Sequence, residues 1–508
     1  MTRKDVKSIH TVLAIDLGAS GGRAILCHFD GERLHLDEVH RFVNNPVEKD
    51  GYLMWDFDML LSEIKTGIKK AAEAVPFESI GIDTWGVDYG IVRGDKLIEG
   101  PVCYRDTRTR GLSKEIPKGL HPFEMYLRVG IQMMEINTIY QLEALKREKP
   151  ELFIDPECKL LMMPDLFNWA LSGKATAEIT ISSTTQLFDP HFKRFDYGLI
   201  RGLGFNNDMF QKTVEPGEFL GMLKDDIREE LGLPESHMIK ILAVAGHDTA
   251  SAVAAVPFNP KKALFLSSGT WCLIGAELEQ AMLTRTSADA NLSNEVGYGG
   301  KIRYLKNVTG LWLVQQMRES MKKPGRDLGF EDMENLAKSA KPYELFIDPD
   351  AEVFSLPGDD MLQRIHDYLV ETCQAAVSDI EDVKYQAQVL RCVYDSIALK
   401  VRMACDKISE NLDRNFKIIH MVGGGIQSEL LCQTIADLTQ RTVHAGPVEA
   451  TALGNAAAQF IAGGYIKNHE EARRIIGESF EVKVYEPGVH LKAANKAYKE
   501  FQKLISNN

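Results

Sequence analysis

The 508-residue sequence has no uncharged apolar stretch long enough to cross a bilayer, and no long run of lysines and arginines. Its net charge of -13 argues against a nucleic-acid or anionic-membrane surface. The eight cysteines are dispersed without a CxxC pair, which favours reduced thiols over a zinc site. The first ten residues lack the apolar segment of a signal peptide. We therefore expect a cytoplasmic protein that binds small molecules, not nucleic acid or membrane.

Two common nucleotide-binding signatures are also missing from the glycine-rich stretch "DLGASGGR" at 16–23. It has neither the GxxxxGK[ST] spacing of a P-loop nor the GxGxxG of a dinucleotide-binding turn. The stretch joins two apolar segments, "TVLAIDLG" and "ASGGRAIL", which predicts a β-hairpin. An Asp at a strand end can hold hydrated Mg²⁺ while turn amides and an Arg face phosphates. An ordinary hairpin turn is the alternative.

Two later glycine turns have similar settings. "KALFLSSGTWCLIGAEL" at 262–278 predicts a second hairpin, an internal echo that suggests two related lobes. "MVGGGIQSE" at 421–429 places three glycines between a strand and a helix, which is costly unless a ligand approaches closely. A γ-phosphate would rest between the turn at 16–23 and the turn of the second hairpin, with Thr270 as its contact. Adenosine or its phosphates would lie against Gly424 and Gly425. Simple packing turns are the alternatives.

Two further stretches carry polar groups. "SIGIDTWGVDYGIV" at 79–92 has the character of a strand, and "DTWGVDYG" at 83–90 places polar groups on it. Here Gly86 would let a sugar approach, Trp85 would pack, and Asp83 or Asp88 would accept from hydroxyls. "VAGHDTASAV" at 244–253 places Asp248 where a strand becomes a helix, so Asp248 either caps the helix or acts as a catalytic base. Helical spacing predicts helices within 55–75, 137–147, 164–173, 389–412 and 493–505.

In chain order, eight stretches resemble the FGGY carbohydrate kinases. They are "VLAIDLGASGGR", "SIGIDTWGVDYG", "PVCYRDTRT", "GHDTASAV", "LSSGTW", "NVTGLWLVQ", "MVGGGIQ" and "AGPVEATALGN". The resemblance covers about residues 11 to 470, and "DTWGVD", "GHDTASAV" and "LSSGTW" together are its most specific part. Gly21 and Ile426 depart from the usual family pattern, and neither departure removes a reactive group.

The resemblance implies a fold: two α/β lobes of the actin-like, ribonuclease-H-like type, with a catalytic cleft between them. The N-terminal lobe, 1–245, would supply sugar and phosphate contacts. The C-terminal lobe, 246–508, would supply the catalytic base and ATP binding. The chain is expected to be a monomer or a homodimer.

The resemblance also implies an activity, the phosphorylation of the ketose L-rhamnulose at its C1 hydroxyl by ATP and Mg²⁺, in L-rhamnose catabolism. Asp248 would take the hydroxyl proton and Asp16 would bind the metal. Gly86, His247, Asp248 and Thr249 would surround the sugar, with Asn307 in the sugar or nucleotide pocket. The expected ATP contacts are Ala19, Ser20, Gly21, Gly22, Arg23, Thr270, Gln315, Gly424 and Gly425.

The same sequence features fit other sugar acceptors and two other classes of protein. L-fuculose, L-ribulose, D-xylulose and glycerol are rival acceptors, because fold and phosphate loops do not fix the sugar. Actin-like and chaperone ATPases share the lobes, but a chaperone needs a peptide-binding domain after them. A sugar-sensing repressor needs a helix-turn-helix with a basic face. We expect neither of these two additions here.

Overall fold

The computed structural model describes residues 9–115, 121–325, 327–355, 358, 360–375 and 379–507. Residues 1–8, most of the stretch in which no signal peptide is expected, lie outside this part. The chain forms two compact units, and neither is continuous in sequence. Unit 1 comprises 1–257, 277–304 and 449–481, and unit 2 comprises 258–276, 305–448 and 482–508. The expected lobe boundary between residues 245 and 246 stays a prediction; by packing, residues 246–257 and two later segments belong to unit 1.

Unit 1 is built on a six-stranded sheet. Its order is β14 (Phe219–Met222), β15 (Lys240–Leu242), β6 (Ser79–Thr84), β1 (His10–Gly18), β2 (Gly21–Phe29) and β3 (Leu34–Val43). The predicted first hairpin is confirmed, because β1 and β2 pair antiparallel around a two-residue turn. β6 runs parallel to β1 on its other side. Residues at the ends of β1 and β6 therefore lie next to each other.

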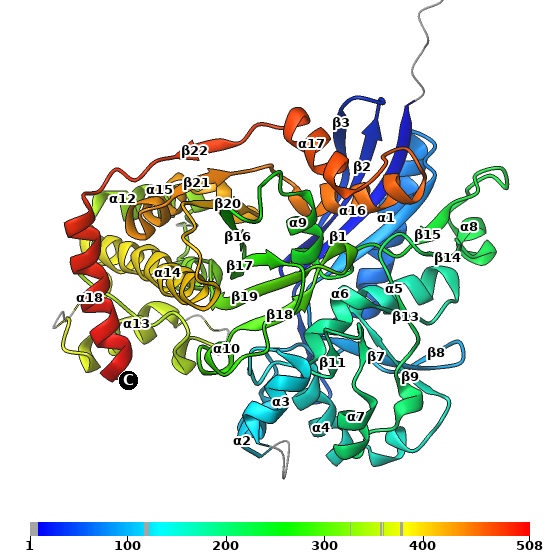
Figure 1. Ribbon diagram of the computed structural model, residues 1–508, viewed down its shortest axis with the longest axis horizontal. Coiled ribbons are helices and arrows are strands. Elements are labelled where there is room, and N and C mark those ends of the chain that lie inside the picture. The colour runs from blue at the N-terminus through cyan, green and yellow to red at the C-terminus, as the bar shows by residue number, and fades with distance from the viewer. Residues whose placement is uncertain are drawn as a thin grey trace, which may run out of the picture. The chain divides into compact units, whose positions relative to one another are not determined.

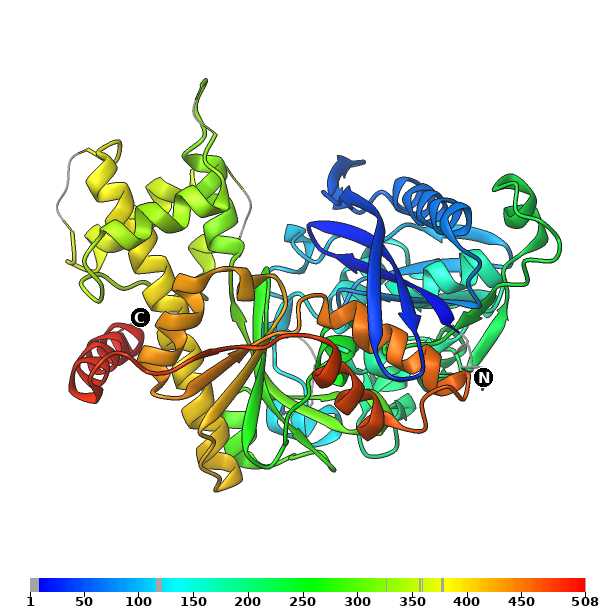
Figure 2. The same cartoon turned by 90° about the horizontal axis from the view of Figure 1, so that it is seen from above.

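Helices cover both faces of this sheet (Figures 1 and 2). α1 (Phe57–Ala74) packs on β2 and β3 with the apolar stripe that its spacing predicts, and its N-cap Asp56 accepts from Met59 N at 3.0 Å. On the other face, α16 (Ala450–Ala462, orange) and α9 (Asp248–Ala255, green) pack on β1 and β6. Gln459 of α16 donates to the Leu13 carbonyl of β1 at 3.0 Å. Because α16 packs on both the sheet and α9, it helps to set where α9 begins relative to the sheet.

One predicted strand is interrupted. The sequence favours strand from Ser79 to Val92, but β6 ends at Thr84 and β7 (Tyr89–Arg93) belongs to a separate sheet with β8 (Lys96–Glu99) and β9 (Cys158–Met162). The chain turns at residues 85–88, where Val87 has φ +69°. A backbone in this conformation cannot continue a strand. Gly86 therefore lies in a turn and not on a strand.

The remaining elements of unit 1 are short. The small sheets are β4 (Val47–Lys49) with β5 (Tyr52–Met54), β10 (Ala177–Glu178) with β13 (Thr213–Val214), and β11 (Phe188–Asp189) with β12 (Arg194–Phe195). The helices are α2 (Leu112–Glu115), α3 (Pro122–Val129), α4 (Thr138–Glu148), α5 (Met163–Ser172), α6 (Ile179–Ser182), α7 (Tyr197–Gly202), α8 (Asp225–Glu230), α10 (Arg285–Asp289) and α17 (His469–Ser479).

Unit 2 holds most of a seven-stranded sheet. The sheet order is β18 (Ser293–Val296, a unit 1 segment), β19 (Ile302–Thr309), β17 (Trp271–Leu278), β16 (Ala263–Ser268), β20 (Ile418–Val422), β21 (Thr442–Ala445) and β22 (Lys483–Tyr485). The second predicted hairpin is confirmed: β16 and β17 pair antiparallel, while β20 runs parallel to β16. This repeats the arrangement of β2, β1 and β6, as the internal echo suggested.

The helices of unit 2 pack around α14 (Val383–Leu412), the long yellow helix of Figure 1. They are α11 (Trp312–Ser320), α12 (Phe330–Ser339), α13 (Met361–Glu371), α15 (Glu429–Thr439) and α18 (Leu491–Asn507). α14 begins before the predicted start at 389, at the N-cap Asp382, and ends where Asp413 turns left-handed. Across the described residues, every helix is too short or too polar to span a membrane.

Candidate active site

Acidic side chains of unit 1 gather at the ends of β1 and β6 and the starts of α9 and α16. Asp16 on β1 pairs in register with Asp83 on β6 and with Arg23 on β2. Arg23 donates to Asp16 at 2.7 Å and also to Glu449, just before α16. Asp248 lies close enough for its charge to act on both Asp16 and Asp83. Arg23 therefore pairs with two carboxylates of this cluster, Asp16 and Glu449, and its charge also acts on Asp83.

The cluster is electrostatically unfavourable without a further cation. Burial raises the pKa of Asp16 to about 6; Arg23 opposes this rise, and the neighbouring carboxylates add to it. Burial, with the charge of Asp16, also raises the pKa of Asp83 well above its usual range. Asn455 donates to one Asp83 oxygen at 2.7 Å, whereas the other oxygen is buried without a hydrogen-bond partner. Excess negative charge and a spare buried oxygen suit a divalent cation.

Mg²⁺ fits this donor set as a partly hydrated ion. Among the residues that the structure describes, no group of three or more His, Cys, Asp or Glu side chains is placed to hold a metal. Mg²⁺ is usually held by one or two carboxylates, with water and substrate phosphates completing its octahedron. Asp16, the predicted metal residue, is a carboxylate of this kind.

Asp248 is the first residue of α9, and the structure bears on its two possible roles. The N-cap residue of α9 is His247, not Asp248. The Asp248 carboxylate accepts from the adjacent Thr249, from Oγ1 at 3.0 Å and from its amide, which is one of the first-turn amides without a partner inside the helix. Its side chain is 29% exposed. Asp248 therefore stabilises the start of α9 as a first-turn acid, and its carboxylate is also accessible to a ligand. The role of catalytic base stays a prediction.

Gly86 and His247, both predicted sugar contacts, lie together. A Cβ on Gly86 would stand 3.3 Å from His247 Nε2 and 3.3 Å from Thr184 Cγ2. The next residue, Val87, is held at positive φ by Thr184 Oγ1, which accepts from its amide at 3.2 Å, and by Thr138 Oγ1, which donates to its carbonyl at 2.7 Å. A β-branched residue rarely adopts positive φ, and such strain clusters at functional sites.

The Asp88 side chain is buried and accepts four hydrogen bonds from within the protein. Its carboxylate accepts from Trp55 Nε1 at 2.6 Å, Trp85 Nε1 at 2.9 Å, Tyr104 N at 3.2 Å and Gln141 Nε2 at 2.9 Å. A carboxylate offers about four acceptor sites. Three of these bonds go to Oδ2 and one to Oδ1, and Asp88 is 0% exposed, so of the two alternatives the structure favours Asp83 as the sugar acceptor. Trp85 packs in the core as predicted.

Glu178 is a site residue that sequence reasoning missed. One of its oxygens accepts from Gly246 N at 3.0 Å and from Thr180 N and Oγ1 at 2.9 and 2.6 Å. Thr180 Oγ1 in turn accepts from His247 N at 3.2 Å. Burial raises the pKa of Glu178 to about 7, against the lowering effect of these hydrogen bonds. Glu178 thus anchors the turn that carries His247 and Asp248.

A buried ion pair, also missed from the sequence, supports His247 from the other side. Arg303 on β19 donates from Nη2 to His247 Nδ1 at 3.0 Å and lies 3.2 Å from Glu295 Oε2 on β18. Burial alone would raise the pKa of Glu295, but Arg303 and His247 bring it down to about 2. Glu295 is therefore ionised beside a fully buried guanidinium. Neither residue belongs to a recognisable local motif.

Packing against β3 explains why the turn at 19–23 contains glycine at positions 21 and 22. Gly18 and Gly21 face each other across the turn, so Ala19 and Ser20 form its tip. A Cβ on Gly21 would lie 2.9 Å from the Phe42 carbonyl oxygen, and a Cβ on Gly22 would overlap the Phe42 ring. Close packing on β3 therefore requires both glycines. Their amides stay candidates for phosphate contacts.

In unit 2, the triple-glycine turn packs against the second hairpin. A Cβ on Gly423, which has φ +85°, would lie 2.6 Å from the Ser268 carbonyl oxygen, and a Cβ on Gly425 would overlap the Ser268 hydroxyl. A Cβ on Gly424 would meet nothing within 4 Å. Packing explains Gly423 and Gly425 but leaves Gly424 facing open space, where a ligand can approach.

A third segment of unit 2, residues 310–312, is hydrogen-bonded to the turn of the second hairpin. The Thr270 carbonyl accepts from Gly310 N at 3.1 Å and from Trp312 N at 3.2 Å. The segment continues into the first turn of α11, which carries Gln315, while Asn307 lies on β19 just before it. Thr270, Gln315, Asn307, Gly424 and Gly425 thus all belong to unit 2. The predicted sites Asp16, Ala19–Arg23, Gly86 and His247–Thr249 all belong to unit 1, so the catalytic-base candidate is not in unit 2.

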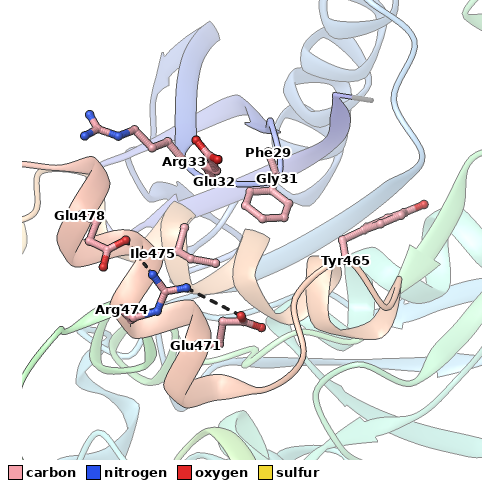
Figure 3. A pocket seen from close by; sticks show the side chains of 9 residues that line it. All are labelled: Phe29, Gly31, Glu32, Arg33, Tyr465, Glu471, Arg474, Ile475 and Glu478. Atoms are coloured by element: carbon pink, nitrogen blue, oxygen red, sulfur yellow. Dashed lines mark hydrogen bonds and ion pairs between the residues drawn. The ribbon is translucent and has the colours of Figure 1, made fainter. Parts of the chain in front are cut away.

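Unit 1 also has a surface pocket of about 470 Å³ between the turn after β2 and α17 (Figure 3). Arg474 occupies its wall and pairs with Glu478 at 2.7 Å and Glu471 at 3.7 Å. None of the predicted site residues lines it. The pocket therefore has no part in the candidate active site.

Comparisons with known proteins identify the family of this chain. The N-terminal domain model of the FGGY family of carbohydrate kinases matches residues 11–255, and the C-terminal domain model matches 264–463. The chain is 40% identical to a protein named rhamnulokinase from Halalkalibacterium halodurans, covering 93% of this chain and 98% of the relative. It is 35% identical to another from Bacteroides thetaiotaomicron, covering 97% and 99%.

Solved structures share the fold. A gluconate kinase from Lactobacillus acidophilus superposes with a TM-score of 0.76 at 16% identity, over 98% of this chain and 97% of its own. A Plasmodium falciparum glycerol kinase with ADP superposes with a TM-score of 0.76 at 13% identity, over 98% of both chains. The chain has their two-domain, actin-like and ribonuclease-H-like α/β fold, and it belongs to the FGGY family of carbohydrate kinases.

Proposed function

We propose that this chain phosphorylates L-rhamnulose at the C1 hydroxyl, using ATP to give L-rhamnulose 1-phosphate and ADP. The near-full-length similarity to proteins named rhamnulokinase supports the sugar. The observation that carries the reaction is the accessible Asp248 carboxylate at the start of α9, beside His247 and the acids Asp16 and Asp83. L-Rhamnose catabolism supplies and consumes these sugars in this proposal.

Phosphoryl transfer needs in-line positioning, charge stabilisation and an acceptor for the hydroxyl proton. Asp248 accepts the C1 hydroxyl proton. Gly86 leaves room for the sugar, and His247 and Thr249 orient it, with Asn307 contributing from unit 2. The Asp83 oxygen that has no hydrogen-bond partner is a further acceptor near Asp248.

Asp16 is proposed to hold Mg²⁺, directly or through water. The ion would neutralise charge on the transferring phosphates. Arg23 now donates to Asp16 and Glu449, and it is placed to exchange one of these partners for a phosphate oxygen. The tip residues Ala19 and Ser20, with Gly21 and Gly22, would offer backbone amides to the phosphates.

Unit 2 is proposed to supply the rest of the nucleotide site. Gly424 would lie against adenosine or its phosphates, because the space beside it is open. Gly425 shares its turn, and Thr270 and Gln315 come from the adjoining segments. The enzyme would act in the cytoplasm on a diffusible ketose, as a monomer or a homodimer.

A substrate panel tests this proposal. ADP release is measured with MgATP and L-rhamnulose, L-fuculose, L-ribulose, D-xylulose or glycerol, and the phosphorylated carbon is identified by ³¹P NMR. We expect the highest kcat/KM with L-rhamnulose and phosphate at C1. A preference for another acceptor contradicts the proposed sugar. ADP release that no sugar stimulates contradicts the proposed reaction.

A further inference from the structure

The buried pair Arg303 and Glu295 determines which way the His247 imidazole is protonated. Two groups compete for His247 Nδ1: the Arg303 guanidinium at 3.0 Å, which has donors and no acceptor, and Glu295 Oε2 at 3.5 Å, which can only accept. The Arg303 contact is the shorter one and has hydrogen-bond geometry, so it favours Nδ1 as an unprotonated acceptor. The proton of the neutral ring must then be on Nε2. Nε2 points to the site: it lies 3.5 Å from Asp248 Oδ1 and faces Gly86.

Arg303 cannot contact a ligand itself, because its side chain is 0% exposed. It is held in place by the Val296 carbonyl, which accepts from Nε and Nη2 at 3.4 and 3.2 Å, and by Glu295. The charged groups that act on it are Glu295, Asp248 and Glu178. Arg303 can therefore affect catalysis in two ways, through the His247 ring that it contacts and through its charge acting on Asp248.

Stability alone does not account for this arrangement. Arg303 Nη1 is buried without a hydrogen-bond partner in the described structure. A buried ion pair is often no more stabilising than an apolar replacement, and an unsatisfied buried donor adds to its cost. A residue retained at such a cost next to a site histidine points to a positioning role.

We propose that Arg303, held by Glu295, is a positioning residue that fixes His247 in the Nε2–H tautomer. This rests on the proposed function, in which His247 binds a sugar hydroxyl. The Nε2–H donor and the Asp248 acceptor then stand side by side, and both engage the reacting hydroxyl. Its oxygen accepts from His247, its proton is directed at Asp248, and the Nε2–H stabilises the negative charge that develops as that proton leaves.

A double-mutant cycle tests this assignment. Arg303→Met with Glu295→Gln removes the donor and leaves no buried charge, and His247→Gln keeps a donor near the Nε2 position without depending on a tautomer. We expect the pair replacement to lower kcat/KM for L-rhamnulose about five- to tenfold in the His247 protein, and by less than about twofold in the His247→Gln protein. The KM for ATP should not change in either background.

Controls separate positioning from folding. Arg473→Met with Glu277→Gln neutralises a second ion pair of unit 1, part-buried and with its atoms 2.7 Å apart, and should act equally in both His247 backgrounds. Arg303→Lys keeps a donor and should restore most activity. Equal losses from the Arg303 replacement in both backgrounds, or a matching rise in the KM for ATP, would overturn the assignment.

A spectroscopic readout does not depend on turnover. Long-range ¹⁵N–¹H NMR of the unmodified protein, with His247 assigned from the His247→Gln spectrum, should show protonation at Nε2 alone. Protonation at Nδ1 overturns the inference, whatever the activity. If no ketose is turned over while the Nε2–H pattern is present, the proposed function fails and the tautomer assignment stands.

Discussion

Gly454 of α16 lies directly against the Ser251 carbonyl of α9, so closely that a Cβ on Gly454 would overlap the oxygen and stand 2.6 Å from the carbon. Ser251 Oγ also donates to the Ala245 carbonyl at 2.7 Å, before the turn that carries Asp248. This helix crossing therefore sets the depth at which α9 presents Asp248.

Gly454→Ala should push α9 away from α16. We expect a loss of about 1–3 kcal/mol in the free energy of unfolding, as for other overpacked sites, together with a fall in kcat. The control is Gly202→Ala, because Gly202 is also a helical glycine, the last residue of α7, but its Cβ would meet nothing within 4 Å. Denaturant unfolding curves and kcat check both variants. Equal stability of the two variants would mean that the crossing is looser than described.

Gly424 and Gly425 should respond differently to the same substitution. Gly424→Ala places a methyl in open space, so we expect unchanged thermal unfolding and a raised KM for ATP. Gly425→Ala places it on Ser268 Oγ and should lower stability by about 1–3 kcal/mol. Differential scanning calorimetry with ATP titrations distinguishes them. An unchanged KM in Gly424→Ala would remove Gly424 from the nucleotide site.

Glu178 should make stability depend on pH. Its pKa is raised from 4.5 to about 7 in the folded protein, mainly by burial, so between these values the folded state holds a proton that the unfolded state has lost. Stability is therefore greatest below about pH 4.5 for this group and falls as the pH rises to about 7, by on the order of 2–3 kcal/mol.

Glu178→Gln should remove this dependence, because an amide oxygen can still accept from Gly246 and Thr180. We expect the variant to match the parent protein near pH 5 and to exceed it near pH 8, measured by urea unfolding at both values. Glu235→Gln, at an exposed glutamate, should follow the parent protein at both. A Glu178→Gln variant that is no more stable at pH 8 contradicts the raised pKa.

The sequence predicts the local features of this site well. The two hairpins, the helix at α1 and the strand-to-helix junction at Asp248 follow from residues close together in the chain, where hydrophobic period and glycine turns act directly. Other features depend on packing between distant segments: position 22 must be glycine because Phe42 packs on it, and position 454 must be glycine because Ser251 does. The interpretation of 79–92 as one strand failed because Val87 is held at positive φ by Thr138 and Thr184, which are far away in sequence.

The buried polar support was not predictable for the same reason. Glu178 and Arg303 contact the His247 turn from 69 and 56 residues away, and neither has a motif that marks it. Charged residues of this kind are usually assigned to the surface, because burial without a partner is costly. Only the fold brings their partners to them.

The most direct test of the account is the turnover of L-rhamnulose by Asp248→Asn. The amide keeps the size of the side chain but cannot accept the C1 proton as a carboxylate does, so we expect kcat to fall about 10²- to 10⁴-fold, with thermal unfolding unchanged. Asp58→Asn, at an exposed first-turn aspartate of α1, should keep the parental kcat. An Asp248→Asn enzyme with a near-parental kcat would contradict the assignment of Asp248 as the catalytic base.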